Sequence, residues 1–452
     1  MWKIKINSLI AIISSKIILK LSTTLFKGGS NFPGKVALAL DKNILSTITK
    51  GYKVVLVTGT NGKTTTTSMI YNILINAGKT VVTNGTGANM NTGIVASFIS
   101  NYKFFRKSND IYAVIETDEA YLKFITESIT PEIITVTNLF RDQLDRYGEV
   151  HTTYSKILEG IHKTPNSLLI LNGDESLLGK IDAKNPSVYY GFNTAINENT
   201  VLSVNADSKF CKFCKTPYSY EYITYNHLGN YFCPKCGYKR PELKFKVDTI
   251  LNISPSGSDV IINNEDYYIN QSGEYNIYNG LCALAVTSEL GITSDCIKTS
   301  LSNQKSSFGR QESIIINGKE IKIILVKNPA GYNQALNTIL LNNDSIDLTL
   351  MLNDNYADGT DVSWIWDVDF EKLAELNIND IAISGIRLYD MAVRLKTANL
   401  NENNFIFCES DDDLISSLTQ SKSNTNYVLV TYTAMLHLRK LLHSKGYINK
   451  IW

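Results

Sequence analysis

Long apolar runs are missing from this chain of 452 residues, and so is an excess of charge of either sign. No stretch approaches the ~18 apolar residues that a membrane-spanning helix needs, so we expect no such helix. The 44 Lys and Arg residues nearly cancel the 43 Asp and Glu residues, so the whole molecule has no field that would attract a polyanion. Internal repeats and low-complexity linkers are also lacking. With 44% hydrophobic residues the chain can build cores, and at ~100–200 residues per domain its length predicts two to four domains.

Cysteine is scarce as well, and its seven residues are an odd number, which argues against a complete disulfide framework. Four of them form two Cys-x-x-Cys pairs, at Cys211 and Cys214 and at Cys233 and Cys236. Four thiolates fill a tetrahedral shell and leave no place for water, so the pattern predicts a structural Zn²⁺; iron or a redox dithiol is a weaker alternative. Such a ribbon could bind nucleic acid, but its Tyr and Phe residues equally suit a small core of its own. Free thiols indicate a reducing compartment, so we expect a cytoplasmic protein.

The N-terminal segment, MWKIKINSLIAIISSKIILKLSTTLFK, interleaves Lys with Ile and Leu as on an amphipathic helix. A signal peptide is not expected, because Ser14, Ser15 and Lys16 interrupt the apolar stretch and no small-residue cleavage site follows. Two interpretations stay open. The helix could pack on its own domain, or it could contact an anionic membrane surface and make the protein peripheral at the inner face of the membrane.

From about residue 54, β-branched runs alternate with helical stretches, which predicts a mostly parallel α/β sheet. The cysteine-rich stretch interrupts this rhythm, and a second α/β series begins near residue 313. We therefore predict an N-terminal segment (1–48), a central domain (49–312) with an inserted ribbon (205–242), and a C-terminal Rossmann-like domain (313–452). The predicted strands are Val54–Val57, Val81–Thr83, Tyr112–Ile115, Ile133–Thr137, Leu168–Leu171, Val260–Ile262, Tyr267–Ile269, Ile321–Val326, Leu348–Leu352, Ile381–Ser384, Phe405–Cys408 and Tyr427–Thr431.

A glycine-containing turn, TGTNGKTTT, joins the first predicted strand to a helix. Gly59 and Gly62 would let backbone N–H groups approach phosphate oxygens, Lys63 could reach the β- and γ-phosphates, and the Thr64 hydroxyl could ligate Mg²⁺. The spacing is shorter than GxxxxGK[ST], but its place between strand and helix predicts a nucleotide site. The predicted ATP-binding residues of this loop are Gly59, Thr60, Asn61, Gly62, Lys63, Thr64 and Thr65.

The same turn resembles the ATP loop of the Mur ligase superfamily, in which ATP phosphorylates a carboxylate and an amine attacks the acyl phosphate. The resemblance implies that Glu116, at the end of the strand IYAVIE, helps Thr64 to hold Mg²⁺; ligands do bind at the carboxyl ends of parallel strands. It also implies that Asn276 and Asn279, three apart on one helix face, lie on the adenine side. Arg310, in the stretch FGRQE, would contact the ATP phosphates.

A further stretch, TNLFRDQLDRYGE, contains Asn138, Asp142 and Asp145. It resembles the segment that follows the next strand in the same superfamily. A capped amphipathic helix would explain the pattern equally well, and both interpretations stay open.

The C-terminal part departs from the Mur ligases that add amino acids. Lys327 and Asn328, in KNPAGYNQ, stand where those enzymes commonly carry an acidic, His-containing stretch, and DGTDVSWIWD follows the next strand. Together with the ribbon, these motifs resemble the MurT family. That resemblance implies an ATP-dependent ligase that amidates the α-carboxyl of D-Glu in the stem peptide of lipid II, a step of peptidoglycan synthesis. Ammonia would come from a separate GatD-type glutaminase in a heterodimer, and Asp361 would complete a Cys–His pair of that partner.

The remaining cysteines agree with a separate glutaminase. Cys282, Cys296 and Cys408 stand in no recognisable nucleophile motif, and the five histidines form no evident pair with them, so we do not expect this chain to hydrolyse glutamine alone. Two alternatives remain. One is a Mur or folylpolyglutamate-type ligase that adds an amino acid, which the C-terminal departures disfavour. The other is a zinc-ribbon ATPase that binds nucleic acid, which the balanced charge disfavours; we expect no nucleic-acid partner.

Overall fold

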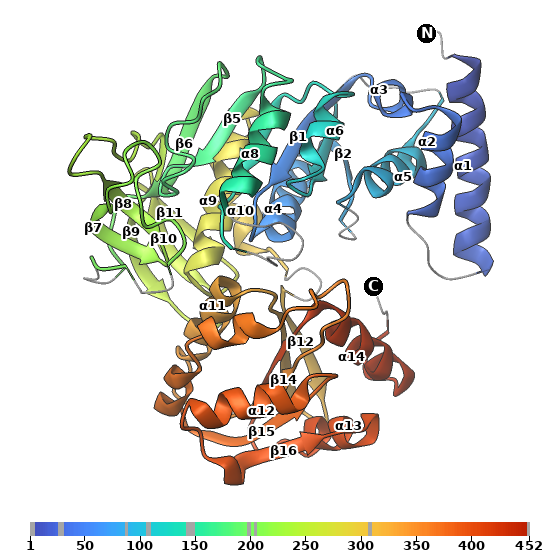
Figure 1. Cartoon of the computed structure of the whole chain (residues 1–452). Coiled ribbons are helices and arrows are strands. Elements are labelled where there is room, and N and C mark those ends of the chain that lie inside the picture. The colour runs from blue at the N-terminus through green and yellow to red at the C-terminus, as the bar shows by residue number, and fades with distance from the viewer. Residues whose placement is uncertain are drawn as a thin grey trace.

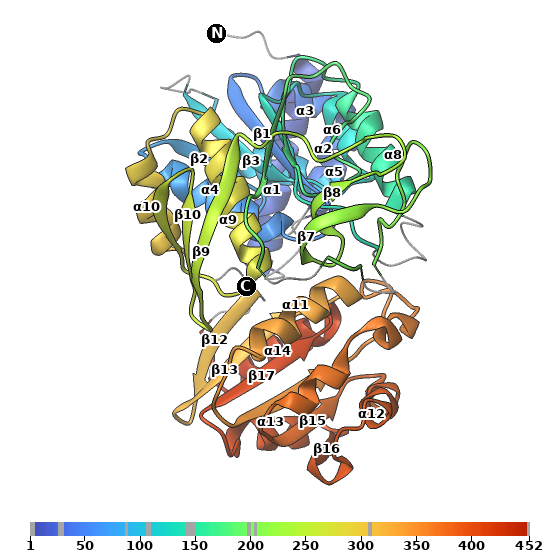
Figure 2. The same ribbon diagram turned by 90° about the vertical axis from the view of Figure 1, so that its left-hand side faces the viewer.

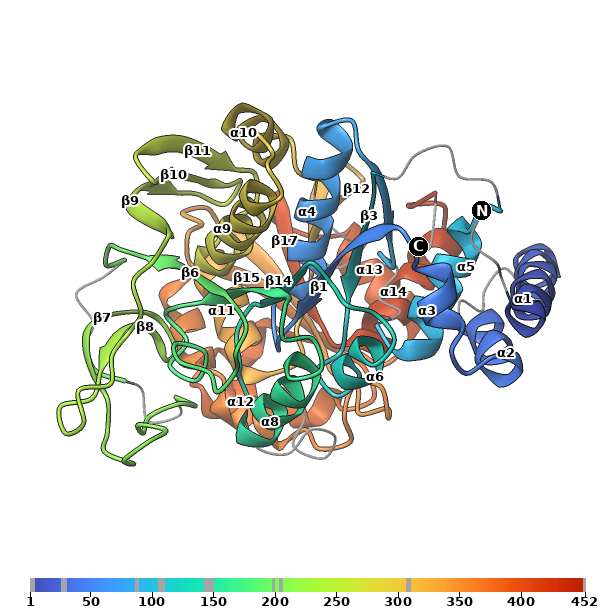
Figure 3. The ribbon, with the colours of Figure 1, turned by 90° about the horizontal axis from the view of Figure 1, so that it is seen from above.

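The computed structural model describes residues 5–25, 31–85, 89–104, 110–141, 150–196, 200–202, 206–305 and 310–449. Two α/β bodies make up the molecule, one above the other in Figure 1. The upper body contains a nine-stranded sheet and the lower body a six-stranded sheet. Seen from above, the N-terminal helices and the cysteine-rich hairpin lie at opposite ends of the upper body (Figure 3).

The upper sheet is parallel over most of its width, as the sequence predicts, and its strand order is β11-β10-β9-β6-β5-β4-β1-β3-β2. Only β9, β10 and β11 pair antiparallel. Each predicted strand of this part forms, whereas β6 and β9 were not anticipated; in β9, Lys, Asp, Thr and Asn interrupt the apolar residues and hide the strand pattern. The bounds are β1 Tyr52–Thr58, β2 Thr80–Thr83, β3 Ile111–Glu116, β4 Ile133–Val136, β5 Leu168–Asn172, β6 Ser187–Phe192, β9 Phe245–Ile253, β10 Ser258–Ile262 and β11 Glu265–Ile269.

Helices cover both faces of this sheet. Along β1, Val55 and Val57 enter one core cluster while Val54 and Leu56 enter the other, which explains the unbroken apolar run of a strand buried on both sides. The first cluster includes α4 (Lys63–Asn76), α9 (Glu274–Glu289) and α10 (Ser294–Ser302). The second includes α1 (Ile6–Leu25), α2 (Phe32–Leu40), α3 (Ile44–Ile48), α5 (Asn91–Asn101), α6 (Leu122–Thr126) and α8 (Val150–Ile161).

The N-terminal helix α1 packs on its own domain through one face. Ala11 and Ile12 are fully buried there, and the Lys16 ammonium donates a hydrogen bond to the Tyr102 carbonyl at 2.7 Å. The first of the two open interpretations is therefore confirmed for this face. Among the helices that the structure describes, none has both the length and the hydrophobicity that crossing a bilayer requires.

The lower body is a Rossmann-like α/β unit with the strand order β12-β13-β17-β14-β15-β16 (Figure 2). Its strands are parallel except β12, which forms a hairpin with β13. The five strands predicted for this part form; β12 was not anticipated, and it starts the sheet at Arg310. The bounds are β12 Arg310–Ile316, β13 Lys319–Leu325, α11 Pro329–Ile339, β14 Ile346–Met351, η1 Ser363–Asp367, η2 Phe370–Glu375, β15 Ile378–Ser384, α12 Leu388–Thr397, η3 Glu402–Asn404, β16 Phe405–Cys408, α13 Asp411–Thr419, β17 Thr425–Val430 and α14 Tyr432–Ser444.

The chain order places a crevice beside β1. After β1 the chain builds β2 and β3 on one side and then crosses to build β4 on the other. Ligands of open α/β sheets bind where the strand order reverses in this way, at the carboxyl ends of the strands. In this molecule those ends carry the glycine turn after β1, Glu116 at the end of β3, and Thr137 and Asn138 after β4.

Candidate active site

The glycine turn after β1 has the shape of an anion-binding loop. Gly59 and Gly62 have positive φ angles of 119° and 84°, and a Cβ at Gly62 would lie 2.2 Å from the Asn279 Oδ1. Only glycine therefore fits both the conformation and the space. Within the described part of the chain, no side chain caps α4 at Gly62, so N–H groups of its first turn are available to an anion.

The loop rests on the residues that follow β4. The Asn61 N–H donates to the Asn138 Oδ1 at 2.9 Å, and the Thr137 hydroxyl donates to the Asn61 carbonyl at 2.7 Å. The Thr60 N–H donates to the Asn138 carbonyl at 2.9 Å. Asn138 thus holds the phosphate loop in place by accepting hydrogen bonds from two of its backbone N–H groups. Asp142 and Asp145 of the same stretch lie outside the described residues.

Lys63 is buried at the start of α4 and turns towards its own loop. Its ammonium donates to the Gly59 carbonyl at 2.5 Å and lies 3.2 Å from the Glu119 Oε1. Both charged groups are almost fully buried. Burial raises the pKa of Glu119 despite the nearby Lys63. Sequence reasoning missed Glu119, although its position in ETDEA, just beyond a buried strand, was an available signal.

Three buried carboxylates lie at and just beyond the end of β3, and the last of them contacts this lysine. Glu116, Asp118 and Glu119 are each less than 10% exposed. The Asn84 side chain fixes the backbone of Glu116 through two hydrogen bonds, and the Asn89 amide donates to the Glu116 Oε1 at 3.3 Å. Buried like charges are costly without a counterion, and carboxylate oxygens are ligands that Mg²⁺ prefers. Among the described residues, only the cysteine cluster brings three or more donor atoms within 4.8 Å of one another, so a Mg²⁺ at these carboxylates would need nucleotide oxygens as further ligands.

Asn276 and Asn279 lie in α9 directly behind the phosphate loop. The Asn279 Oδ1 accepts from the Thr66 hydroxyl at 3.2 Å, and its amide donates to the Asn276 Oδ1 at 3.0 Å. The two asparagines share a helix face, as their spacing predicts. They connect α9 to α4, and Thr66 follows the predicted loop residues Thr64 and Thr65.

The C-terminal body reaches the phosphate loop through KNPAG. The Asn328 amide donates to the Asn61 Oδ1 at 3.2 Å, while its own Oδ1 accepts from the Gly331 N–H and caps α11. The Lys327 charge acts on the Glu119 carboxylate and lowers its pKa, against the larger effect of burial. The sequence showed only that Lys327 and Asn328 differ from the residues of other Mur ligases. Their contact with the phosphate loop could not be predicted, because it depends on how the two bodies meet.

The other predicted phosphate contact, Arg310, is the first residue of β12, where its backbone pairs with Ile324. Its side chain, and the preceding Phe308 and Gly309, lie outside the described residues. Its role in ATP binding stays a prediction.

The four ribbon cysteines come together as a candidate metal centre. Their Sγ atoms all lie within 4.8 Å of one another, at the base of the hairpin β7 (Ser219–Tyr225) and β8 (Leu228–Phe232). Lys215 and Gly237, each directly after a cysteine pair, have φ angles of 61° and 72°, the left-handed turns of two metal knuckles. Tyrosines form the ribbon's own core, as one interpretation expected of its Tyr and Phe residues, whereas Phe210, Phe213 and Phe232 are exposed. That core contains Tyr218, Tyr220, Ile223 and Tyr231.

A buried ion pair joins the ribbon hairpin to the central domain. The His227 Nε2 lies 2.7 Å from the Glu175 Oε2, and neither side chain is exposed. The same Glu175 oxygen accepts from the Leu139 N–H at 3.2 Å, next to the loop below Asn61. Burial alone would lower the pKa of His227, but the Glu175 charge and hydrogen bond outweigh it and raise that pKa above 6.5.

We expect His227→Gln to lower the free energy of unfolding by about 3 kcal/mol, because it leaves a buried carboxylate without its charged partner. The stabilisation by His227 is fully present below pH 6.5, and it is lost as the pH rises through the raised pKa. Urea unfolding between pH 6 and 9 should show this slope in the parent and not in the variant. His437→Gln is the matched control, since its pair with Asp411 is half exposed and should matter little. Equal pH slopes in all three proteins would contradict the assignment.

The loop after β14 separates the two aspartates of the DGTD motif. Asp358 is buried and accepts hydrogen bonds from the Thr433 N–H, at 2.7 Å, and from the Thr433 hydroxyl. Asp361 is exposed, and its Oδ1 accepts only a local hydrogen bond from the Ser363 N–H at 2.8 Å. Asp358 therefore holds the loop in place, whereas the Asp361 carboxylate faces outward.

A salt bridge joins the loop after β14, which contains the motif DGTDVSWIWD, to the central domain. The Arg141 Nη2 lies 3.2 Å from the Asp367 Oδ2, and its Nε lies 3.4 Å from the Asp207 Oδ1. Asp369 precedes a short 3₁₀ helix, and instead of capping it with a side-chain hydrogen bond it pairs with Lys372 at 3.5 Å.

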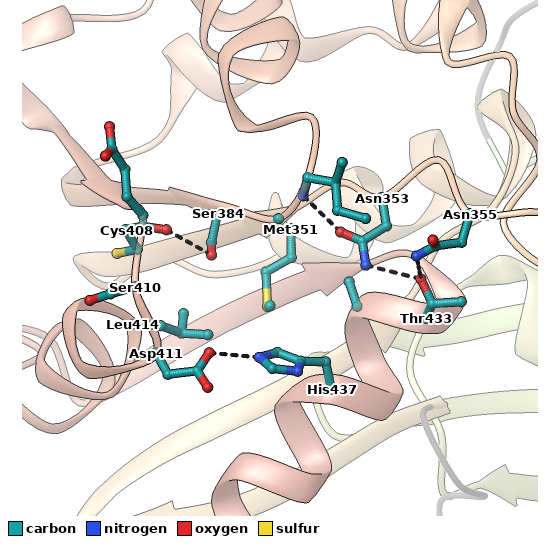
Figure 4. Close-up of a pocket in the computed structure, with 14 residues that line it drawn as sticks. Met351, Asn353, Asn355, Ser384, Cys408, Ser410, Asp411, Leu414, Thr433 and His437 are labelled. Atoms are coloured by element: carbon teal, nitrogen blue, oxygen red, sulfur yellow. Dashed lines mark hydrogen bonds and ion pairs between the residues drawn. The ribbon is translucent and has the colours of Figure 1, made fainter.

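A cavity of about 460 Å³ opens at the carboxyl ends of β14, β15 and β16, beside this loop. Asn353 and Asn355 both donate to the Thr433 hydroxyl on its wall, and His437 pairs with Asp411 on the other side (Figure 4). Cys408 lines the cavity, but partial burial raises its pKa to about 11. Burial likewise raises the pKa of Cys282 to about 11. Among the described residues, no hydrogen bond joins a cysteine to a histidine, and none of these thiols is prepared as a nucleophile.

Comparison with known proteins places this architecture among the Mur ligases. The Mur ligase middle domain family matches residues 57–234, and the MurT ligase C-terminal family matches residues 325–435. A pseudomurein peptide ligase type C from Methanothermus fervidus has a similar structure, with a TM-score of 0.65 at 20% identity over 90% of this chain and 81% of that one. The fold is that of a Mur-type ligase with two α/β bodies.

Full-length relatives narrow the class further. The chain is 40% identical to the lipid II isoglutaminyl synthase (glutamine-hydrolyzing) subunit MurT of Streptococcus pneumoniae, over 93% of this chain and 94% of that one. It is 34% identical to the same subunit of Staphylococcus aureus (strain COL), over 96% of this chain and 97% of that one. The chain belongs to the MurT family.

Proposed function

We propose that this chain is the synthetase subunit of a lipid II isoglutaminyl synthase. It would use ATP and ammonia to convert the α-carboxyl of D-Glu in the lipid II stem peptide to the amide, a step in peptidoglycan synthesis. The observation that carries the proposal is the buried site at the switch point of the sheet, where a phosphate loop and a buried lysine–carboxylate pair meet in a member of the MurT family. The alternatives, amino-acid addition and nucleic-acid binding, are not favoured, because the full-length relatives are subunits of an amidating synthase.

The residues of the site would divide the work as follows. The N–H groups of the loop and the start of α4 would hold the ATP phosphates, and Lys63 would exchange its contact with Glu119 for phosphate oxygens. Thr64 and Glu116 would hold Mg²⁺, which supplies charge neutralisation during phosphoryl transfer to the substrate carboxylate. Ammonia then displaces phosphate from the acyl phosphate. Asn328 and Lys327 would close the site from the C-terminal body.

The proposed partner is a GatD-type glutaminase in a heterodimer. The relatives are named as subunits of a glutamine-hydrolysing enzyme, and burial raises the pKa of the Cys282 and Cys408 thiols, which makes them poor nucleophiles. The exposed Asp361 would serve the partner's Cys–His pair, since a carboxylate beside an imidazole fixes its tautomer and stabilises its charged form. Large apolar side chains exposed on the same body suit a protein partner. They include Tyr356, Trp366, Ile386 and Tyr389.

For the ribbon we propose one structural Zn²⁺. Preparations of the protein should contain one zinc per chain, and Cys211→Ser should abolish this zinc and lower the melting temperature by roughly 5 °C or more, since a closed four-cysteine site contributes directly to folding. Elemental analysis and thermal denaturation measure both effects. Cys296→Ser, outside the cluster, should change neither. Full folding of the Cys211→Ser variant without zinc would contradict the proposal.

The function itself is tested by reconstitution. The chain, a candidate glutaminase, ATP, glutamine and lipid II should give a product whose mass reflects replacement of OH by NH₂, and ammonium chloride should replace both glutamine and the partner. Gain of a whole amino acid would overturn the proposal. Because the lipid tail of this substrate stays in the bilayer, the proposed place of work is the inner face of the membrane.

A further inference from the structure

A surface helix usually exposes polar side chains, but the outer face of α1 exposes large aliphatic ones. Its inner face, packed on the domain, includes the small residues Ser8, Ala11 and Ser15. The outer face carries six large aliphatic side chains that are between 37% and 75% exposed. At ~100° per residue they form one stripe about 120° wide along the whole helix. This stripe consists of Ile6, Leu9, Ile10, Ile13, Ile17 and Leu21.

The charge around the stripe has one sign. The first 40 residues contain six lysines and no Asp or Glu, although the whole chain is nearly neutral. Lys5 and Lys20 are exposed; at ~100° per residue Lys5 falls beside one edge of the stripe and Lys20 just inside that same edge. The first carboxylate, Asp41, accepts a hydrogen bond from Ser8 on the inner side of α1. A second copy of the chain would therefore bring cationic faces together, whereas anionic lipid headgroups complement them.

We propose that α1 lies in the headgroup region of an anionic bilayer, parallel to its plane, with the stripe in the acyl boundary and the lysines among the phosphates. The inference rests on the proposed function, because an enzyme that acts on a lipid-linked substrate must bind at the membrane surface. A peripheral helix of this kind needs a strong apolar face and flanking basic residues, not the length of a membrane span.

Contacts inside the domain connect the membrane-binding helix α1 with the candidate active site. Helix α2 lies between α1 and α5, and Gly34 of α2 packs so closely on α5 that a Cβ there would lie 1.8 Å from the Thr92 carbonyl oxygen. Just before α5, Asn89 donates to Glu116 of the carboxylate cluster. Helix α1 forms the outer edge of the upper body (Figures 1 and 3). A bilayer bound to α1 would thus stand at a fixed distance from the site where the lipid-linked carboxylate reacts.

Vesicle flotation tests the proposal with the full chain bound to its glutaminase. The complex should float with vesicles of equal parts phosphatidylglycerol and phosphatidylcholine, and much less with phosphatidylcholine alone. The variant Ile10→Gln/Ile13→Gln/Ile17→Gln should lose at least about tenfold in partition coefficient. The control Ile75→Gln/Leu251→Gln/Ile315→Gln removes three equally exposed aliphatic side chains elsewhere and should bind as the parent does.

Kinetics provide a second readout. The stripe variant should raise the apparent KM for substrate embedded in vesicles by about tenfold, through its weaker partition, and leave turnover of detergent-dispersed substrate unchanged. Equal flotation of parent and stripe variant would overturn the proposal. The proposal would also be overturned if the parent does not float and forms a dimer, while the stripe variant is a monomer. Flotation does not depend on catalysis, so absence of amidation with every lipid-linked substrate would count against the proposed function alone.

Discussion

Replacement of Lys63 by alanine should lower ammonia-supported amidation by about 10³-fold, because the variant loses the cation that offsets charge on the transferred phosphoryl group. Lys63 is held at the start of α4 between the Gly59 carbonyl and Glu119, so it needs only a short movement to reach phosphate oxygens above the loop. Arginine at this position should not restore activity, since its planar fork does not fit a space shaped for a point charge.

The assay for Lys63→Ala uses ammonium chloride in place of glutamine, which removes the partner from the measurement. Lys53→Ala is the matched control: Lys53 lies in β1, the strand that leads into the phosphate loop, but it is 42% exposed and pairs with Asp110, so its loss should leave the rate unchanged. Thermal denaturation of both variants separates catalysis from folding. A Lys63→Ala enzyme with more than a tenth of the parent rate would show that this lysine does not serve the phosphoryl group.

How far the sequence predicted the site depended on how local each feature is. The phosphate loop was predictable because Gly59, Gly62 and Lys63 lie within five residues, and the left-handed φ of each glycine is a property of the turn itself. Glu116 was predicted from the resemblance to the Mur ligase superfamily together with its place at the end of a strand. Glu119, three residues further on, was missed: its place beyond a buried strand marks it as a candidate, but its contact with Lys63 is visible only in the structure.

Contacts between distant segments were beyond prediction. Asn328 and Asn61 are 267 positions apart, and their hydrogen bond depends on how two separately folded sheets meet. The pair His227–Glu175 was hidden for a similar reason, because the ribbon is an insertion whose packing on the domain has no sequence pattern. The strands were predictable where both faces are buried, as in β1, and β9 was missed because polar residues interrupt its apolar run.

The motif DGTD illustrates the same limit and leads to the second large effect. The family resemblance assigns the role toward the partner to Asp361, and the structure gives the two aspartates different surroundings: it buries Asp358 against Thr433 and leaves Asp361 exposed. Asp361→Asn should therefore lower glutamine-dependent amidation by about 10³-fold, because the partner's histidine would lose the carboxylate that orients it. Ammonia-dependent amidation should stay at the parent level, since the ATP site is unchanged.

Two matched variants separate this role from a structural one. Asp369→Asn changes an exposed aspartate of the same segment, whose carboxylate pairs with Lys372, and both activities should survive. Asp358→Asn removes an acceptor that anchors the loop, so both activities and the melting temperature should fall together. Glutamate release by the partner, measured in the complex, locates the defect of Asp361→Asn in glutamine hydrolysis. If both activities of Asp361→Asn survive, the carboxylate does not act on the partner; if both are lost, it belongs to the ligase site of this chain.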